Sequence, residues 1–436
     1  MNWVDFFVDA AMVIGIPLTV MGFYFLIVAL FSLKKEVRYK ASAPEKKFAV
    51  VIAARNEAAV IGKLVDSLCS QKYPKELYKI FVVPNNCTDN TEEVARRHGA
   101  EIVHCTVPVK TKGEVLHHAL PKIMNGFDAI CVFDADNIVD ENFLAEMNNA
   151  FCAGAKCAQG YRDSKNPYTN WLSGSYTLYY KMINFIQNRA RSNAKLSALI
   201  NGTGFAVSCD LINQIGGWNT KTLVEDLEFS VHCILAGEKV HWVPAALTYD
   251  EHPVKFGQSV TQRKRWTSGT LHVSTLYIPK FFKAFRKQKK FAFLDALLVL
   301  CLPYVQLLSM FLAVVTALPV IIDSFTKPDG FQKILEFVGI PLAFSYAGLS
   351  FGCVILSFIK PRMAIGITKG VLSFWIFMAT WIPIQIFCAI KRTTTWKQID
   401  HTGNENSRSV NKKQYKAAKQ SQEQRRSRKI ASVRVD

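Results

Sequence analysis

The stretch AICVFDAD at residues 129–136 decides the fold of this chain. Residues 129–133 are apolar and predict a short buried strand, and Asp134 and Asp136 follow that strand directly. Three further strands are predicted upstream, with helical stretches between them: residues 48–53, 80–83 and 101–104. Strands that alternate with helices predict an α/β domain with a doubly wound, mostly parallel sheet.

Polar residues follow three of these predicted strands, at the point where each strand ends. They are Arg55-Asn56-Glu57, the segment from Asn85 to Asp89, and Asp134-Ala135-Asp136. In doubly wound sheets, ligands bind beyond the carboxyl ends of the strands. We therefore expect the three clusters to meet at one edge of the sheet and to form one site.

The Asp134-x-Asp136 pair predicts a site for a divalent cation, and through that cation for a nucleotide diphosphate. Carboxylates and diphosphates are both negative, so a hard cation with oxygen ligands must lie between them. Such a cation would offset the charge of a departing diphosphate. Lys112 offers a positive charge for a phosphate, and Gly113 beside it allows the phosphate to approach closely. Taken alone, each motif has a simpler explanation: the Asp134-x-Asp136 pair as an ordinary turn at a strand end, and Lys112 as a solvated loop lysine.

Two further clusters lie downstream. Three acids at residues 225–228 lie in the first turn of a predicted helix. One explanation is that negative charge stabilises the start of any helix. The other is that one of these carboxylates serves as a general base. Gln262, Arg265 and Trp266 recur at i, i+3 and i+4 and share one helical face. Arg265 could clamp a pyrophosphate and Trp266 could stack on a sugar, although a basic helix at a membrane surface has similar residues.

Composition and hydropathy indicate an integral membrane protein. The chain has 436 residues, half of them hydrophobic, and a formal net charge of +19. About 20 apolar residues span the hydrocarbon core of a bilayer. Four uncharged runs reach that length: residues 10–33, 296–322, 337–359 and 370–390.

The distribution of basic residues predicts the orientation. The N-terminus carries Asp5 and Asp9 and no Lys or Arg, whereas basic residues follow the first apolar run. By the positive-inside rule, the N-terminus lies outside and the large polar domain lies in the cytosol. A cleaved signal peptide is the alternative, but the positive n-region is missing and the run exceeds the usual h-region.

The C-terminal region gives a conflicting count of spans. Residues 391–436 hold 13 Lys and Arg against 4 Asp and Glu, which predicts a cytosolic, partly disordered tail near lipid. Three full crossings after a cytosolic domain would instead leave this tail outside. We therefore expect residues 363–390 to enter and leave on one side, bent near Gly370 or Pro383. The alternative is that one longer run contains two crossings.

The segment at residues 280–290 precedes the second apolar run and carries six basic residues and no acid. Phe281, Phe282 and Phe285 are spaced for one helical face. This pattern predicts a basic amphipathic helix at the cytoplasmic membrane surface. An ordinary solvated helix end is the alternative.

In this order, the clusters resemble the membrane-embedded, inverting family-2 glycosyltransferases of the GT-A fold. That group includes cellulose, chitin, hyaluronan and poly-N-acetylglucosamine synthases. The resemblance covers roughly residues 45–270, and its most specific element is the Gln262-x-x-Arg265-Trp266 motif, which is associated with processive synthases. Thr395-Trp396 is similar to the poly-N-acetylglucosamine synthase branch. A gating loop like that of cellulose synthase and a regulatory domain are not apparent, which argues against cellulose.

The resemblance implies a role for each cluster. It assigns nucleotide-sugar binding to Glu57, Asn85, Lys112, Asp134 and Arg265, a Mg²⁺ or Mn²⁺ ion to Asp136, the general base to Asp226, and acceptor binding to Asn201, Gly202, Thr203, Gln262 and Trp266. Asn85 stands where the family usually has an Asp that accepts a hydrogen bond from uracil. An amide oxygen can also accept that bond, so UDP-GlcNAc or another UDP-hexose is the implied donor.

Hydropathy and charge, together with the resemblance over the central domain, predict a domain plan for a multi-pass protein of the cell membrane. The expected parts are an extracytoplasmic N-terminus at 1–9, a transmembrane helix at 10–33, a cytosolic glycosyltransferase domain at 45–270, amphipathic interface helices at 271–295, a C-terminal transmembrane region at 296–390 and a basic cytosolic tail at 391–436.

The implied reaction lengthens a β-linked polysaccharide by a single inverting displacement through an oxocarbenium-like state. The implied partners are the nucleotide-sugar donor, a saccharide or lipid-linked acceptor and membrane lipids, with no nucleic acid. Addition of one sugar to a lipid acceptor is an open alternative, because the predicted spans are few. A non-catalytic transporter or scaffold is a third, and the intact acidic motifs argue against it.

Overall fold

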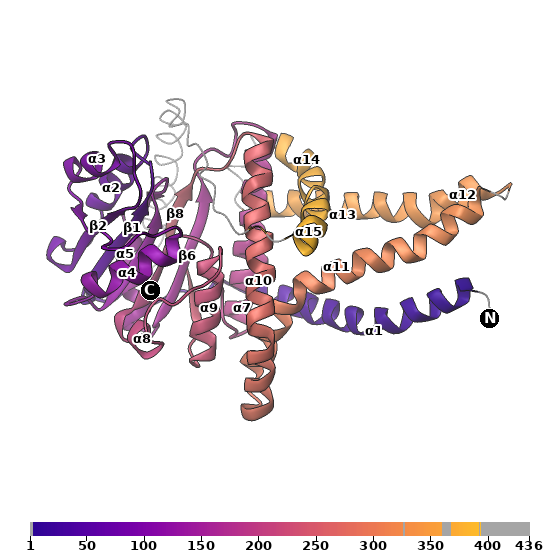
Figure 1. The fold of residues 1–436 in the computed structure, drawn as a ribbon, viewed down its shortest axis with the longest axis horizontal. Coiled ribbons are helices and arrows are strands. Elements are labelled where there is room, and N and C mark those ends of the chain that lie inside the picture. The colour runs from indigo at the N-terminus through magenta and orange to yellow at the C-terminus, as the bar shows by residue number, and fades with distance from the viewer. Residues whose placement is uncertain (1–2, 326–327, 360–367, 392, 394–436) are drawn as a thin grey trace, which may run out of the picture. The chain divides into compact units, whose positions relative to one another are not determined.

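The computed structural model describes residues 3–325, 328–359, 368–391 and 393, and its ribbon is drawn in Figure 1. An eight-stranded sheet with the strand order β3-β2-β1-β4-β7-β6-β8-β5 forms the centre of the polar domain. Its strands are β1 (Phe48–Ala54), β2 (Tyr78–Pro84), β3 (Glu101–Ile102), β4 (Ala129–Asp134), β5 (Ile138–Val139), β6 (Cys157–Ser164), β7 (Phe205–Ser208) and β8 (Val240–Asp250).

The four strands predicted from the sequence pair in parallel, as expected. β1 lies between β2 and β4, and β3 adds to the outer side of β2. The sheet as a whole is mixed, because β7 runs antiparallel to both β4 and β6, and β5 runs antiparallel to β8. This mixed sheet with helices on its faces is the GT-A fold.

Both faces of the sheet are covered, so β1 is apolar at nearly every position. Phe48, Val50 and Ile52 point to one core layer, and Ala49 and Val51 point to the other. The first layer is covered by α2 (Ile61–Cys69), α3 (Thr91–Arg97) and α5 (Phe143–Cys152), and the second by α4 (Lys112–Ile123), α8 (Cys209–Gln214) and α9 (Glu225–Leu235) (Figure 1).

The remaining helices surround this domain or extend from it. They are α1 (Trp3–Leu30), η1 (Phe31–Leu33), η2 (Lys75–Leu77), α6 (Trp171–Met182), η3 (Ile183–Arg189), α7 (Ala190–Asn193), α10 (Phe256–Gln288), α11 (Phe291–Ser324), α12 (Gly330–Ile334), η4 (Leu335–Gly339), α13 (Ile340–Ile359), α14 (Thr368–Ala379) and α15 (Trp381–Ile390).

Three stretches of helix in the described residues are long and apolar enough to cross a membrane: Val13–Leu33, Phe291–Pro319 and Lys369–Ile390. A shorter apolar stretch, Ile340–Val354, lies between the second and the third. In the third, 28% of the residues are buried inside the protein, against 6% in each of the other two. The third stretch therefore packs on the rest of the chain more than the others do.

The last apolar run is broken near Pro383, one of the two places expected. α14 ends at Ala379 and α15 begins at Trp381. Pro383 lies within the first turn of α15, where a missing N–H is tolerated. Gly370 lies inside α14 and serves close packing, because a Cβ there would lie 2.7 Å from the carbonyl carbon of Gly174 in α6. Residues 363–367 of the expected re-entrant segment lie outside the described residues.

The basic segment near residue 285 forms the end of α10, and only part of its expected apolar face is correct. Phe281 is fully buried and packs on Phe293 of α11, with ring centroids 6.1 Å apart. Phe282 is 53% exposed, because the adjacent position on a helix is turned by about 100°. The three phenylalanines therefore do not share one face.

A buried ion pair joins the polar domain to α1 and α11. Arg191 of α7 pairs with Asp295 of α11, and neither side chain is more than 4% exposed. Tyr24 of α1 donates its hydroxyl to the same carboxylate at 2.6 Å. Arg191 also donates to the carbonyl of Ser197 at 2.7 Å. These contacts tie three distant segments of the chain together at one point.

The Arg191–Asp295 pair should dominate the stability of this junction. We expect Asp295→Ala to lower the free energy of unfolding by about 3–5 kcal/mol, because it leaves a buried guanidinium without its counter-charge. Thermal or denaturant unfolding of the detergent-solubilised protein measures this loss. The control is Glu101→Ala, which removes an exposed pair with Lys79 and should cost at most about 1 kcal/mol. Equal stability of the two variants would contradict the prediction.

Candidate active site

The three polar clusters that follow β1, β2 and β4 lie at one edge of the sheet. The side chain of Arg55 donates through Nε to the carbonyl of Asn85 at 3.2 Å. The register of β1 on β4 pairs Ala53 with Asp134. Glu57 is close enough to Asp134 and Asp136 for their charges to raise its pKa, as described below. The convergence expected from topology is therefore present.

Two residues of these clusters hold the loops rather than face the site. The carboxylate of Asp89 accepts hydrogen bonds from the backbone of Ala58 at 3.2 Å and of Thr91 at 3.1 Å. Burial alone would raise the pKa of Asp89, but these hydrogen bonds and that of the Thr91 hydroxyl lower it overall. Asn56, with φ of 54°, accepts from the backbone of Thr88 at 2.7 Å.

Asn85 is buried, with 8% of its surface exposed. Its backbone N–H donates to Ala54 at 2.8 Å, so the loop continues the register of the sheet. Its side-chain oxygen lies 3.5 Å from Nη2 of Arg55, which is the outer limit of a hydrogen bond. Arg55 thus orients the amide that we expect to face the base of a nucleotide.

Lys112 and Asp134 form the central ion pair of the site. The Nζ atom of Lys112 lies 2.5 Å from Oδ1 of Asp134, donates to the carbonyl of Gly202 at 2.8 Å, and lies 3.7 Å from Oε1 of Glu225. Burial would raise the pKa of Asp134, but Lys112, with Arg265 among other cations, lowers it overall. Both partners therefore carry charge, and Lys112 connects the DxD turn to the first turn of α9.

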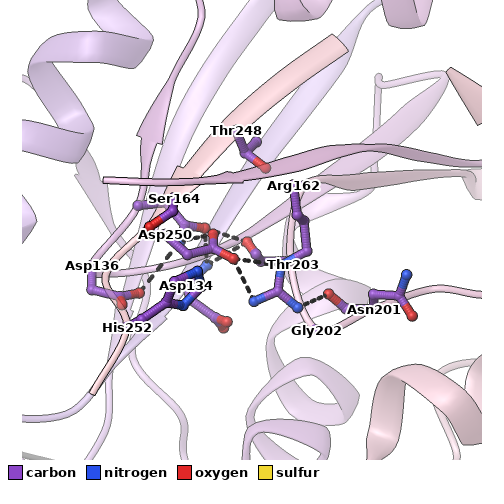
Figure 2. A network of polar contacts seen from close by, with 12 residues as sticks. Asp134, Asp136, Arg162, Ser164, Asn201, Gly202, Thr203, Thr248, Asp250 and His252 are labelled. Carbon is purple, nitrogen blue, oxygen red and sulfur yellow. Dashed lines mark hydrogen bonds and ion pairs between the residues drawn. The ribbon is translucent and has the colours of Figure 1, made fainter. Parts of the chain in front are cut away.

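Negative charge accumulates around this pair. Burial, followed by the charges of Asp136 and Asp134, raises the pKa of Glu57 to about 9. Burial also raises the pKa of Asp250 to about 6, with Asp136 and Asp134 adding to the effect and Arg162 opposing it. Figure 2 shows Asp134, Asp136 and Asp250 in one polar network. The site is therefore suited to a ligand that brings positive charge.

The residues present fit a divalent cation that the donor helps to bind. In the part of the chain that the structure describes, no group of three or more His, Cys, Asp or Glu side chains is arranged to hold a metal ion. Mg²⁺, however, is usually bound by one or two carboxylates together with waters and substrate phosphates. The half-buried carboxylate of Asp136 fits that mode of binding, and a cation there would offset the charge that raises the pKa of Glu57.

The loop at residues 201–204 supports the DxD turn. Thr203 has no exposed surface, and its hydroxyl accepts from the backbone of Asp134 at 2.9 Å and donates to Asn137. It therefore positions Asp134, and the expected acceptor contact at Thr203 stays a prediction. The backbone carbonyl of Asn201 accepts a hydrogen bond from the guanidinium of Arg162. Gly202 adopts a φ of 76°, and its carbonyl accepts the hydrogen bond from Lys112.

Sequence reasoning missed a second group of site residues, from β6 and β8. Arg162 pairs with Asp250 at 2.5 Å (Figure 2). Its guanidinium lies 4.3 Å from the ring centroid of Tyr180. His252 stacks between Tyr180 and Tyr176, with centroids 5.1 and 5.4 Å away. Burial lowers the pKa of His252 to about 3, so this imidazole is neutral. The one sequence signal was the polar run that starts at Asp250, directly after an alternating strand.

The three acids at the start of α9 have different environments. Burial raises the pKa of Glu225 to about 7, with Lys112 opposing the shift and Asp226 adding to it. Asp226 is half-buried in the same first turn. Glu228 is fully buried, accepts from the backbone of Thr222 at 2.8 Å and accepts from the hydroxyl of Tyr277 at 2.7 Å. Glu228 therefore anchors α9 to α10.

The face of α10 that carries Gln262, Arg265 and Trp266 lies beside α6. Each of the three side chains is partly exposed. Oε1 of Gln262 is buried and has no hydrogen-bond partner among the described residues. Trp266 stacks on Tyr179, with centroids 6.5 Å apart, and meets the edge of Tyr180 at 6.4 Å. An acceptor amide oxygen without a donor beside an aromatic cluster suits a ligand with hydroxyl groups.

This fold and this site define a glycosyltransferase. The model of the family described as Glycosyltransferase like family 2 matches residues 44–269, which is more than half of the chain. The chain therefore belongs to this family, and the family-level resemblance of the sequence motifs is confirmed.

Among curated relatives, the chain is similar to the probable glycosyltransferase YdaM of Bacillus subtilis, with 27% identity over 260 residues, or 56% of this chain and 59% of that protein. It is also similar to the β-monoglucosyldiacylglycerol synthase of Synechocystis sp., with 25% identity over 236 residues, or 52% of this chain and 49% of that protein. The match spans about half the length of each relative, so it shows a shared domain rather than a shared activity.

The resemblance to poly-N-acetylglucosamine synthases is more distant. The poly-β-1,6-N-acetyl-D-glucosamine synthase of Staphylococcus epidermidis is 23% identical over 225 residues, which is 50% of this chain and 53% of that protein. A solved mannosyltransferase from Pyrobaculum calidifontis, PcManGT in complex with GDP-Man and Mn²⁺, covers 89% of this chain and 98% of its own with a TM-score of 0.56. At 16% identity, that likeness shows the fold alone.

The raised pKa of Glu57 gives a testable dependence on pH. In the absence of metal and donor, folded Glu57 keeps its proton up to about pH 9, whereas the unfolded chain loses it near the ordinary value of 4.5. The unfolded state therefore binds fewer protons between these values, and the contribution of Glu57 to stability falls as the pH rises through this range. Glu57→Gln removes this loss.

We therefore expect the Tm of Glu57→Gln, relative to the wild type, to rise between about pH 5 and about pH 8.5. Thermal unfolding in EDTA at a series of pH values measures this difference. A difference in Tm that stays constant over the range would contradict the raised pKa.

Proposed function

We propose that this chain is a membrane-bound inverting glycosyltransferase that adds sugars from a nucleotide-sugar donor to a growing β-linked polysaccharide. UDP-GlcNAc or another UDP-hexose is the proposed donor, and the enzyme is proposed to be processive. The observation that carries this proposal is the face of α10, where the unpartnered Oε1 of Gln262 and the ring of Trp266 lie beside the tyrosines of α6.

The donor is proposed to bind at the carboxyl edge of the sheet. Asn85 faces the base, and Glu57 and Asp134 face the ribose and diphosphate side of the site. Lys112 and Arg265 supply the positive charge that a diphosphate requires. The likeness to a mannosyltransferase solved with GDP-Man and Mn²⁺ supports a nucleotide sugar and a divalent cation as a class. When bound at Asp136, Mg²⁺ or Mn²⁺ offsets the charge of the departing diphosphate.

Asp226 is the proposed general base. Its neighbour Glu225 lies 3.7 Å from Lys112, so the first turn of α9 is next to the donor site. Asp226 takes the proton from the attacking hydroxyl of the acceptor, and that oxygen forms the new bond to the anomeric carbon as the diphosphate leaves. One displacement of this kind inverts the anomeric configuration. Asn201, Gly202, Gln262 and Trp266 are the proposed contacts of the acceptor.

The membrane topology is also a proposal. Residues 1–9 lie outside, 10–33 cross the bilayer, and 45–270 with the interface helices at 271–295 lie on the cytosolic side. Within the C-terminal region at 296–390, the segment that contains α14 and α15 enters and leaves on one side, which puts the tail at 391–436 in the cytosol. The break at Thr380 and the packing of this segment on α6 support a re-entrant course.

Addition of a single sugar to a lipid acceptor is the second candidate function. The relative from Synechocystis sp. is a β-monoglucosyldiacylglycerol synthase, and it is more similar to this chain than the poly-N-acetylglucosamine synthase is. Both candidates share the donor site and the base. They differ in whether the acceptor continues to slide along Trp266 after each transfer.

The assignment of the base is tested by Asp226→Asn. This change keeps the size of the side chain but removes its ability to accept a proton, and general-base catalysis is worth about 10²–10⁴-fold. We expect a fall in kcat of that order, with the donor affinity unchanged by calorimetry. Glu225→Gln is the matched control and should retain more activity. If Glu225→Gln is inactive and Asp226→Asn is active, the base is assigned to the wrong residue.

The length of the product distinguishes the two candidate functions. We expect purified protein in nanodiscs, given radiolabelled UDP-sugars and Mg²⁺ or Mn²⁺, to make long chains even with excess acceptor. Trp266→Ala should shorten or abolish these chains, because it removes a ring face that a sugar can slide along. EDTA should stop the reaction. Monosaccharide-extended lipid without a ladder of longer products would replace the processive proposal with single addition.

A further inference from the structure

The motif at residues 262–266 contains a second arginine, Arg263, which faces away from the site. Successive residues on a helix are turned by about 100°, so Arg263 points to a different side of α10 from Gln262, Arg265 and Trp266. It is fully buried, which is unusual for an arginine in an otherwise half-exposed motif. Its surroundings indicate what this side chain does.

Arg263 binds the point where α14 ends. Its Nη1 donates to the carbonyl of Phe377 at 2.9 Å and to Oγ1 of Thr380 at 2.8 Å. Its guanidinium also lies 4.6 Å from the ring centroid of Phe377 and 5.4 Å from that of Trp381. Among the described residues, no carboxylate forms an ion pair with it.

The break between α14 and α15 needs such a partner. The last carbonyls of a helix have no intrahelical donor, and the C-terminus carries partial negative charge that favours a cation. A broken helix inside a membrane region is tolerated where protein satisfies the freed backbone groups. Arg263 supplies a charged donor at this position, from a helix that lies more than one hundred residues earlier in the chain.

Neighbouring residues of α10 bind the same pair of helices. Thr267 accepts a hydrogen bond from the indole of Trp381 at 3.0 Å. The hydroxyl of Ser268 accepts from the backbone of Thr393 at 2.9 Å. Lys264 lies 4.1 Å from the ring centroid of Phe387. One side of α10 therefore holds α14 and α15, while the other side carries the proposed acceptor contacts.

We propose that Arg263 is a positioning residue that fixes the acceptor face of α10 relative to α14 and α15. This inference rests on the proposed function and deepens it. Trp266 packs with Phe377 and Trp381 in one aromatic cluster that also includes Tyr176 and Tyr179. A shift of the α14 end away from Arg263 displaces Phe377 and Trp381, and with them the tyrosines on which Trp266 stacks. The hydrogen bonds that Arg263 makes to described residues go to Ser259, Phe377 and Thr380, and none goes to the residues of the proposed donor site.

The test compares Arg263→Met and Thr380→Val, which remove the two partners of one hydrogen bond. We expect each to lower kcat/KM for the acceptor by about tenfold or more, the equivalent of one hydrogen bond to a charged group. The dissociation constant of UDP, measured by calorimetry, should change less than about twofold. The loss in the double variant should be smaller than the product of the two single losses, because both changes break the contact between Arg263 and Thr380, while Thr380→Val also removes the hydrogen bond of that hydroxyl to the carbonyl of Phe377. Arg263→Lys should recover part of the activity, since an ammonium can reach one of the two acceptors.

Hydrogen exchange provides a readout that does not depend on activity. Amides at the end of α14 and the start of α15 should exchange faster in Arg263→Met, while those of β4 stay protected. Lys283→Met is the matched control, because it removes an exposed cation from the same helix.

Three results would overturn the proposal. They are unchanged acceptor kinetics in both single variants, multiplicative losses in the double variant, or a fall in UDP affinity that equals the fall in acceptor kcat/KM. If the wild type transfers no sugar, the proposed function is wrong, but the role of Arg263 can still be tested by hydrogen exchange. Unchanged exchange at the α14–α15 break in Arg263→Met would then refute that role. If Arg263→Met does not fold, Thr380→Val and Arg263→Lys carry the same comparison.

Discussion

The concentration of carboxylates at one edge of the sheet is the constraint on which the rest of the site depends. Lys112 neutralises one of them directly, and the lower pKa of Asp134 records that pairing. Arg162 partly compensates another at Asp250. Burial, together with the charge that is left, raises the pKa of Glu57, so the arrangement of carboxylates favours a cation. A divalent cation that binds together with a diphosphate would reduce the repulsion among these carboxylates.

The framework around these charges is built to keep them in place. Thr203 fixes the backbone of Asp134, Asp89 fixes the turn after β1, and Glu228 ties α9 to Tyr277 of α10. Each of these residues satisfies backbone or hydroxyl groups near a carboxylate that faces the site. Glu228 thereby joins α9 to α10, and Lys112 joins the first turn of α9 to Asp134 at the edge of the sheet.

The sequence predicted the parts of this site that follow from local pattern. Strand ends and helical spacing located Asp134, Asp226 and Gln262, because one strand or one helix turn determines where each lies. It did not predict the direction of β7, the support role of Thr203 or the pairing of Arg162 with Asp250. These depend on contacts between residues 69 to 88 positions apart, about which periodicity carries no information. A bend near Pro383 was expected, but its contact with Arg263 was not, since Arg263 lies on another helix.

The junction of Tyr24, Arg191 and Asp295 has a consequence for how the chain matures. Arg191 is synthesised 104 residues before Asp295, so its guanidinium has no counter-ion until the start of α11 has been made. Its final packing must therefore wait until α11 has emerged and docked beside α1. A fragment cut after residue 270 would lack Asp295 and would leave Arg191 permanently without this partner.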